Sequence, residues 1–388
     1  MVQKTAENRG LTRAAEIYQD RGQRVRELKA AGKTIIGYHC CYVPVELLTA
    51  AGVVPFRIVG DTTTPTSVAD SVLENEMCAW VRNCFEGLIT GRLGFLDGMV
   101  VPHACNSVER IYGYWKQYGN LKYAQSLDVP HVFQRGTFQF FRQEIQDFKT
   151  SLERLTGSTI SPEAVAAAIE LHNRNRALVQ HLYALRKESP PLVSGTEVLQ
   201  TLVAGLSLPV EEFNHLLEEV IQEAEQRRGQ IRGNPVRLLL HGCVVDNLPL
   251  LELLESFDSR IVIDDQPIGT RTFWFQVRTD GDPLLALSEA YLKAVRCPRT
   301  MMVERKNFEE GLKQRFEYLV DYAREFNVQG VVLHILRFCD PHQFDNPDLT
   351  NYLKAQGLSS VTLDEDYTVG NIGRLKTRVE AFIETLTL

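Results

Sequence analysis

The sequence predicts an α/β fold of two parallel-sheet lobes with a helical insert between them. Three observations carry this prediction. Apolar runs of strand length alternate with amphipathic helices near the N-terminus and again in the C-terminal part, as is typical of parallel sheets. The stretch 140–232 shows helical periodicity and almost no strand signal. One strand of each block ends in His-x-Cys, as His103-Ala-Cys105 and His241-Gly-Cys243, which is a weak internal duplication.

The first block begins with an amphipathic helix at 11–31, which Gly32 closes as a C′ glycine. Pro44 fits the first turn of a short helix. The other elements follow as strands and helices in alternation. In order, the block contains helix 11–31, strand 34–38, helix 44–51, strand 53–59, helix 69–90, strand 97–101 and helix 106–118.

The middle of the chain is predicted to be helical. Ser161 is a good N-cap, and it is followed by Pro162 and Glu163 in the first turn. This helix extends to about residue 187, where Pro190-Pro191 stops it, and two further helices follow at 195–206 and 210–228. The predicted domains are a first α/β lobe at 1–139, a helical insert at 140–232 and a second α/β lobe at 233–388.

The second block returns to alternating strands and helices after Gly233-Asn-Pro235. Its last helix places Leu375, Val379 and Phe382 on one face. The expected elements are strand 236–240, helix 248–255, strand 261–263, helix 283–294, helix 308–326, strand 328–336, strand 361–363 and helix 372–386.

Charge and composition exclude several classes of partner. The 388 residues include 42 Lys+Arg and 49 Asp+Glu, a net charge of -7 without any basic run, so a nucleic-acid partner is not expected. No stretch approaches the ~18 apolar residues of a membrane span. The N-terminus is polar and lacks the apolar region of a signal peptide. We therefore expect a cytoplasmic protein without a membrane partner, whose thiols stay reduced.

Nucleotide-binding and hydrolase motifs are absent from the sequence. Gly32-Lys33-Thr34 resembles the end of a P-loop, but position 27 is Glu where a glycine is required, and the segment follows a helix instead of a strand. No GxGxxG follows a predicted strand, and no GxSxG occurs. Nothing in the sequence therefore predicts that this chain itself binds a nucleotide.

The eight cysteines are the unusual feature of the composition. Four of them, Cys40, Cys105, Cys243 and Cys339, follow predicted strands directly. Ligands of open parallel sheets bind outside the carboxyl ends of strands, so two facing lobes would bring these thiols together. No CxxC pair is present, and several thiolates from distant loops suit an iron–sulfur cluster better than a structural zinc. The alternative, that each cysteine is a small buried apolar residue, stays open at this point.

Three of these segments resemble the signatures of a known family. The segment 37–47, Gly-Tyr-His-Cys-Cys-Tyr-Val-Pro-Val-Glu-Leu, the segment 95–106 around Cys105 and the segment 337–342 around Cys339 resemble those of the 2-hydroxyacyl-CoA dehydratase and benzoyl-CoA reductase family. Weaker similarity runs through further segments, so that the match covers nearly the whole chain. These further segments are 69–71, 281–283, 297–299 and 375–382.

The resemblance implies two Rossmann-like domains and a [4Fe–4S] cluster held by three cysteines, here Cys40, Cys105 and Cys339, with one iron open. It implies a lyase reaction on an acyl-CoA. One electron placed on the thioester of a 2-hydroxyacyl-CoA gives a ketyl radical anion that expels the hydroxyl group. The resulting enoxy radical loses its acidified β-proton and returns the electron, and the product is the 2-enoyl-CoA. In the reductase branch the electrons stay in an aromatic ring. The family also implies a homologous second subunit in a heterodimer and a separate ATP-dependent iron–sulfur activator.

Several thiols depart from this pattern. Cys41 stands where the family usually has a small hydroxyl residue. Cys78, Cys243 and Cys297 are candidate extra ligands, which leaves room for a double-cubane cluster held by six cysteines in a relative that reduces small molecules. The form of the third signature favours the single cubane. A cluster-free assembly or binding subunit is the third alternative.

Other residues near the predicted ligands are weaker candidates. Glu46 and His103 lie close to Cys40 and Cys105 in the sequence and are candidate catalytic groups. Their alternatives are a helix-start carboxylate and a strand-end histidine that serve the fold. Cys84 has no strand-end position, and we expect it in the core.

Overall fold

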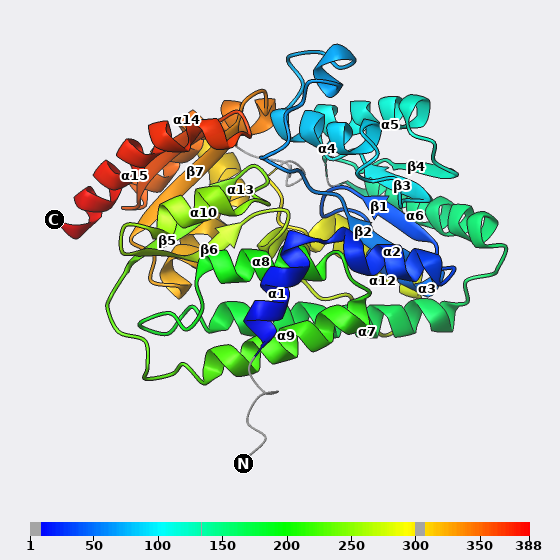
Figure 1. The fold of residues 1–388 in the computed structure, drawn as a ribbon, viewed down its shortest axis with the longest axis horizontal. Helices are drawn as coiled ribbons and strands as arrows, with labels where there is room; N and C mark the ends of the chain where they lie inside the picture. The colour runs from blue at the N-terminus through cyan, green and yellow to red at the C-terminus, as the bar shows by residue number, and fades with distance from the viewer. Residues whose placement is uncertain (1–8, 133, 299–306) are drawn as a thin grey trace.

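A computed structural model describes residues 9–132, 134–298 and 307–388, and it contains two four-stranded, fully parallel sheets (Figure 1). Their strand orders are β2-β1-β3-β4 and β6-β5-β7-β8. The predicted α/β class with two lobes is confirmed. The strands are β1 Ile35–Tyr38, β2 Val54–Arg57, β3 Gly98–Pro102, β4 Tyr123–Leu127, β5 Val236–Gly242, β6 Ser259–Asp265, β7 Gly330–Leu336 and β8 Ser359–Glu365.

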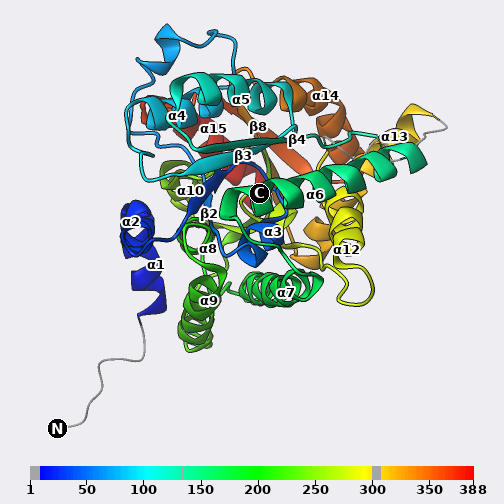
Figure 2. The same ribbon diagram turned by 90° about the vertical axis from the view of Figure 1, so that its right-hand side faces the viewer.

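The helices of the first lobe lie on both faces of its sheet. Figure 2 shows α4 and α5 on one side of β3 and β4, with α3 and α6 on the other. The N-terminal helices α1 and α2 pack beside the insert. These helices are α1 Gly10–Gln19, α2 Gly22–Ala30, α3 Val45–Ala50, α4 Ala79–Ile89 and α5 Asn106–Tyr118.

Two predicted helices of this lobe were too long. The predicted helix 11–31 is divided at Asp20, whose carboxylate accepts a hydrogen bond from the N–H of Gly22 at 3.1 Å and starts a new helix there. In the predicted helix 69–90 only the part after residue 78 is helical. The N–H of Ala69 instead donates to the carboxylate of Glu86 at 2.6 Å, which holds a short 3-10 turn against α4.

The middle of the chain forms the predicted helices along both lobes (Figure 1). Ser161 caps α7 as expected, and its hydroxyl accepts from the N–H of Ala164 at 3.2 Å. Helix α7 contacts α3 of the first lobe, and α8 contacts β6 of the second. The domain boundaries themselves stay a prediction. These helices are α6 Arg135–Thr156, α7 Pro162–Ala184, α8 Gly195–Gly205 and α9 Val210–Glu225.

The second lobe repeats the strand order of the first. Helix α12 continues into a π-helical turn at Ala290–Ala294, and α15 buries the predicted face with Leu375, Val379 and Phe382. Strand β4 and helix α14 have no counterpart in the sequence prediction. The helices are α10 Leu248–Glu255, α11 Thr270–Phe273, α12 Pro283–Glu289, α13 Phe308–Glu325, α14 Asp340–Ala355 and α15 Ile372–Thr387.

The repeated strand order places one topological switch point in each sheet. In the first sheet β2 lies on one side of β1 and β3 on the other, so the direction in which strands are added reverses between β2 and β3. In the second sheet β6 and β7 flank β5 in the same way. Such points are where open α/β sheets bind ligands. Cys40 and Cys105 follow β1 and β3, and Cys243 and Cys339 follow β5 and β7. All four strand-end cysteines of the sequence therefore lie at the two switch points.

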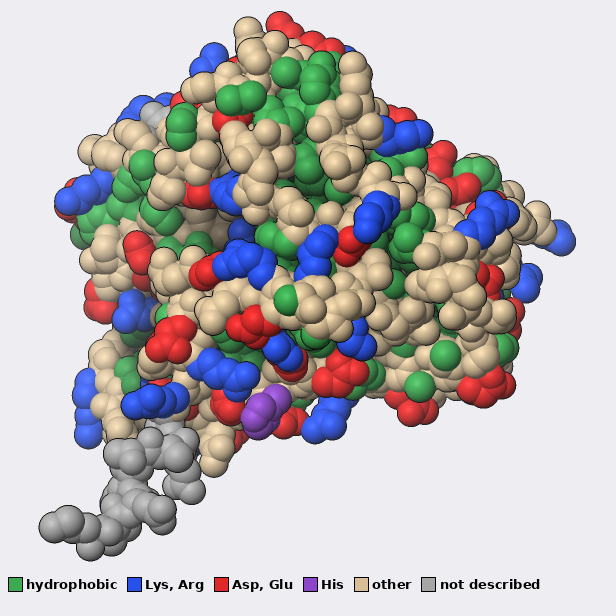
Figure 3. Space-filling view, turned by 45° about the vertical axis from the view of Figure 1, so that its right-hand side comes forward, with side chains coloured by type: hydrophobic (Ala, Val, Ile, Leu, Met, Phe, Trp, Pro, Cys, Tyr) green, Lys and Arg blue, Asp and Glu red, His purple; other side chains and the backbone are tan. Residues whose placement is uncertain are grey.

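The outer surface carries charges of both signs. In the face shown in Figure 3, Lys and Arg side chains are interspersed with Asp and Glu. Among the described helices, none combines the length and apolar character that a bilayer crossing requires.

Candidate functional site

Seven of the eight cysteines line one cavity of about 90 Å³, to which both lobes contribute; we call it the thiol cavity. The remaining wall is largely apolar and contains two arginines and one histidine. The lining residues are Cys40, Cys41, Arg57, Cys78, Trp80, Val81, Ala104, Cys105, Val108, Cys243, Val244, Pro267, Arg271, Cys297, Leu336, Cys339, Pro341 and His342. The fold thus gathers thiols from segments about 300 residues apart in the chain.

The three sequence-predicted ligands share a property that the other cysteines lack. Cys40, Cys105 and Cys339 are partly exposed, whereas the other five are buried, and none of the eight forms a disulfide. Cys84 has 0% exposure and lies outside the thiol cavity, in the core where it was expected.

Three of the cavity thiols stand at the beginning of a helix. Cys78, Cys105 and Cys339 are the N-cap residues of α4, α5 and α14. The exposed N–H groups and the dipole at a helix N-terminus favour negative charge there, which stabilises a thiolate relative to a thiol. This arrangement suits an anionic group bound between the three helices. Neither Cys78 nor Cys339 was predicted at a helix start, because α4 was predicted to begin too early and α14 was not predicted.

The backbone is strained at Cys40 and at the residue before Cys339. Cys40 has φ +57°, and Phe338, just before Cys339, has φ +63°. Non-glycine residues in this left-handed region cost on the order of 1–3 kcal/mol each, and they concentrate at functional sites. The surrounding structure therefore holds both strand ends in conformations that the chain would not adopt by local preference.

Four of the thiols form one group around Cys339. A hydrogen bond with Cys339, together with burial, raises the pKa of Cys78 well above its ordinary range, and Cys105 adds to this shift. Burial and then Cys339 raise the pKa of Cys243. The sulfur of Cys243 also accepts a hydrogen bond from the N–H of Leu336 at 3.2 Å. Cys339 therefore interacts with thiols of both lobes.

A second group lies around Cys40. The sulfur atoms of Cys40 and Cys41 are 3.9 Å apart. The hydrogen bond from Cys41 lowers the pKa of Cys40 to about 6, against the opposing effect of burial, and Arg57 lowers it further. The same contact and burial raise the pKa of Cys41. Cys40 is thus the thiol of this pair that ionises first.

Two buried arginines bring positive charge to the thiol cavity. Arg57 ends β2 and is 1% exposed, and Arg271 in α11 is 3% exposed. The guanidinium of Arg271 donates two hydrogen bonds to Asp265, at 2.8 and 2.9 Å. Neither arginine was predicted as a site residue, although an arginine within the apolar run 53–59 is a signal that could have indicated Arg57.

A histidine on the cavity wall was also missed. The rings of His342 and His241 meet edge to face, with their centroids 5.4 Å apart. Nδ1 of His241 lies 2.7 Å from the carboxylate of Asp265, which also accepts from the hydroxyl of Tyr318 at 2.7 Å. Asp265 and its hydrogen-bond partners therefore lie behind His342 and Arg271 and support them in the cavity wall.

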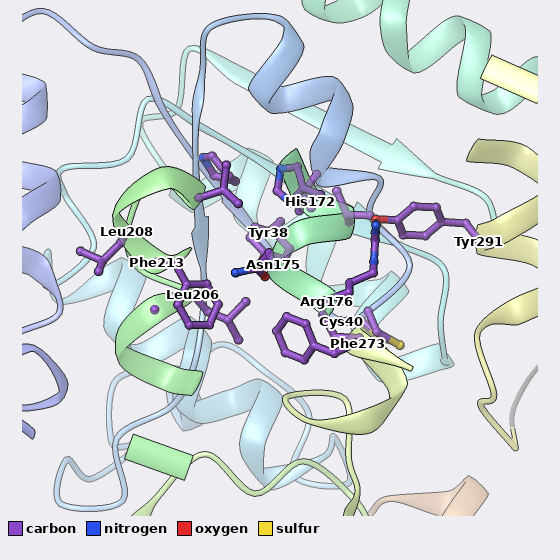
Figure 4. A pocket seen from close by; sticks show the side chains of 17 residues that line it. Tyr38, Cys40, His172, Asn175, Arg176, Leu206, Leu208, Phe213, Phe273 and Tyr291 are labelled. Carbon is purple, nitrogen blue, oxygen red and sulfur yellow. Dashed lines mark hydrogen bonds between the residues drawn. The ribbon is translucent and has the colours of Figure 1, made fainter. Parts of the chain in front are cut away.

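A smaller pocket of about 50 Å³ adjoins the thiol cavity, and Cys40 and Cys41 line both. Its wall is mostly apolar. Figure 4 shows Phe273 beside Cys40, and Arg176 directed toward Tyr291. The hydroxyl of Tyr291 is 3.3 Å from the Arg176 guanidinium.

The two weaker catalytic candidates lie outside the thiol cavity. Glu46 has 0% exposure, and its carboxylate accepts hydrogen bonds from Arg176 and, at 2.8 Å, from the hydroxyl of Tyr291. Burial alone would raise the pKa of Glu46, but Arg176 lowers it below its ordinary range. His103 is partly exposed, and its ring lies 3.1 Å from the carboxylate of Asp128. These contacts favour structural roles, and a catalytic role of either residue stays a prediction.

Burial of His172, on the wall of the smaller pocket, predicts a loss of stability in mild acid. Burial lowers the pKa of this histidine to about 4, below the ~6.5 of an exposed histidine. The neutral histidine contributes stability to the folded protein. This contribution is fully present above the pKa of the unfolded state, and it is lost as the pH falls toward the pKa of the folded state. The urea concentration at the unfolding midpoint should therefore decrease as the pH is lowered from 7 to 5, and it should decrease less steeply in His172→Gln. A pH dependence in His172→Gln as steep as in the wild type would contradict this prediction. Replacing the exposed His215 by Gln is the control and should leave the pH dependence unchanged.

The donor set of the thiol cavity fits a cluster better than a single ion. In the described part of the chain, no three His, Cys, Asp or Glu side chains converge as ligands of one metal ion. A cluster carries its irons at its own corners, so its cysteine ligands stand farther apart than the ligands of one ion. The thiol cavity offers such a cluster seven thiols from both lobes, three of them at helix N-termini, within a largely apolar wall.

The fold and site therefore define an α/β protein that gathers thiols between two similar lobes. Residues 40–386 match the family described as 2-hydroxyglutaryl-CoA dehydratase, D-component, and the chain belongs to that family. It is 28% identical to a subunit of the benzoyl-CoA reductase of Thauera aromatica over 385 residues, 97% of this chain and 98% of that one.

Two further relatives are named as dehydratase subunits. The chain is 26% identical to the beta subunit of (R)-2-hydroxyglutaryl-CoA dehydratase of Acidaminococcus fermentans, over 92% of this chain and 94% of that one. It is 22% identical to the (R)-phenyllactyl-CoA dehydratase beta subunit of Clostridium sporogenes, over 93% of this chain and 94% of that one. The resemblance found in the sequence is thereby confirmed, and these names indicate a component of an enzyme complex.

Proposed function

We propose that this chain is the iron–sulfur subunit of an acyl-CoA enzyme that catalyses ketyl-radical dehydration of a 2-hydroxyacyl-CoA to the 2-enoyl-CoA. The observation that carries the proposal is the thiol cavity, which seven cysteines line and in which four of them follow the strands at the switch points of both sheets. The names of the relatives support the substrate class, because they pair this chain type with CoA thioesters.

A [4Fe–4S] cluster bound in the cavity would supply one electron to the thioester and an open iron for a substrate oxygen. The protein's own residues would serve it in three ways. Apolar side chains such as Val81, Val108 and Leu336 exclude water from the cavity wall. The helix N-termini behind Cys105 and Cys339 stabilise their thiolates. Arg271, oriented by Asp265, presents a fixed cation.

We propose Cys105 and Cys339 as two of the ligands, because the sequence predicts both and both cap a helix that begins at the thiol cavity. The sequence prediction adds Cys40 as the third ligand. The geometry supports Cys78, because Cys78 is also an N-cap and its thiol interacts with Cys339. We propose Cys78 for a single cubane, and the substitutions described in the Discussion decide between the two thiols.

The reaction also needs an electron source and a partner. Since the sequence contains no nucleotide-binding motif, we propose that a separate ATP-dependent iron–sulfur activator delivers the electron. The relatives are named as subunits of larger enzymes, which supports a homologous second subunit in a heterodimer. Because one relative is named as part of a benzoyl-CoA reductase, an aromatic CoA thioester is the second substrate class to assay.

One observation favours a second candidate function. Cys40, Cys78, Cys105, Cys243, Cys297 and Cys339 all line the same cavity, which is the number of thiols that a double-cubane cluster needs. We propose a double-cubane reductase of small molecules as the alternative.

Iron and sulfide analysis after anaerobic purification separates the two. About four irons per chain are expected for the single cubane and about eight for the double cubane, with equal amounts of sulfide within error. A colourless chain without iron after strictly anaerobic purification would contradict both and leave the cluster-free assembly subunit.

A further inference from the structure

Arg57 is a buried arginine with few partners. Its guanidinium donates a hydrogen bond to the carbonyl of Cys40 and lies over the ring of Tyr38, with the Cζ atom 5.4 Å from the ring centre. Its Nε is buried and has no hydrogen-bond partner. Within the described residues, no carboxylate pairs with this side chain.

The four other buried arginines each have compensating partners. Arg271 forms a bidentate pair with Asp265, and Arg176 forms an ion pair with Glu46. Arg237 has no carboxylate, but its guanidinium donates to three backbone carbonyl groups, at 2.7, 2.8 and 3.1 Å. Arg186 has one carbonyl acceptor and two unpartnered nitrogens, but its guanidinium lies 3.8 Å from the carboxylate of Asp264. Arg57 alone of these five has neither a carboxylate partner nor more than one carbonyl acceptor.

An uncompensated buried cation destabilises the fold unless an anion occupies the space next to it. The space next to Arg57 is the thiol cavity, whose cysteines would bind a cluster as thiolates. A cluster held by thiolates is anionic, and its reduction adds one more negative charge. A fixed cation therefore favours the reduced state over the oxidised state.

We propose that Arg57 is the counter-ion of the thiolate-held cluster and that its charge raises the reduction potential of that cluster. This inference rests on the proposed function, because it requires a cluster in the thiol cavity. In this account Arg57 positions and polarises the cluster site, and it takes no part in proton transfer. A higher reduction potential makes it easier for an external electron donor to reduce the cluster.

The test is a redox titration of the anaerobically purified protein, followed by the electron paramagnetic resonance signal of the cluster. Arg57→Gln and Arg57→Met remove the charge, and Arg57→Lys retains it. We expect a more negative midpoint potential in the first two variants and a value near wild type in the third. Arg237→Gln is the matched control, because it removes a buried arginine outside the cavity, and its potential should not shift.

The outcomes are distinguishable. Unchanged potentials in Arg57→Gln and Arg57→Met would overturn the inference, and so would an equal shift in Arg237→Gln. If the two neutral variants fail to retain iron while Arg57→Lys retains it, the loss follows the charge and supports the inference; loss in all three overturns it. A wild-type chain without iron would instead remove the proposed function itself.

Discussion

Replacing Cys339 by alanine is expected to abolish the iron centre, measured as the loss of iron, sulfide and visible absorption in anaerobically purified protein. The reason is its position: Cys339 caps α14 and interacts with thiols of both lobes, Cys78 and Cys243. Removing one sulfur atom from a partly exposed site costs the fold only about 1 kcal/mol, so the variant should remain folded.

The matched control is Cys84→Ala, which removes a buried thiol outside the cavity and should keep its iron. An unchanged spectrum in Cys339→Ala would refute the ligand assignment. The pair Cys40→Ala and Cys78→Ala then identifies the third ligand. Loss of iron only in Cys78→Ala supports the N-cap set, loss only in Cys40→Ala supports the sequence prediction, and partial loss in both supports the double cubane.

The second large effect is expected on stability. Glu46→Ala should lower the free energy of unfolding by about 3–5 kcal/mol, because it leaves the Arg176 cation buried without its carboxylate. Urea unfolding measures this loss. Glu317→Ala breaks the exposed pair with Lys313 in α13 and should cost less than about 0.5 kcal/mol.

The double variant Glu46→Ala/Arg176→Met separates the ion pair from simple packing loss. With no uncompensated charge left, its destabilisation should be smaller than the sum of the two single variants. A strictly additive result, or a loss below about 1 kcal/mol in Glu46→Ala, would show that the pair does not stabilise the fold in this way.

The strands that carry the thiols were predictable because they are apolar, short and followed at once by cysteine. Strand β4 was missed because Tyr123–Leu127 is half polar and lies at an edge of its sheet, where only Leu127 is buried. Helix α14 was missed because Pro341 and Pro347 interrupt its pattern, although Pro341 fits the first turn and Pro347 is accommodated inside the helix.

The site was predictable where chemistry and strand ends coincide, and less so where it depends on distant contacts. Cys78 is an N-cap because α4 begins only at Ala79, and the segment before it is held by side-chain contacts such as that of Glu86 with Ala69, which periodicity does not contain. The pairing of Glu46 with Arg176 joins residues 130 positions apart. Arg57 as an uncompensated cation becomes visible only when the residues around it are known.

The matching strand orders of the two sheets have a mechanical consequence. Cys105 belongs to the first lobe and Cys339 to the second, and both face one cavity. A group bound to both thiols would act as a cross-link between lobes whose segments are far apart in the chain. Binding to the folded form stabilises it, so assembly of the cluster and closure of the two lobes would become one coupled equilibrium.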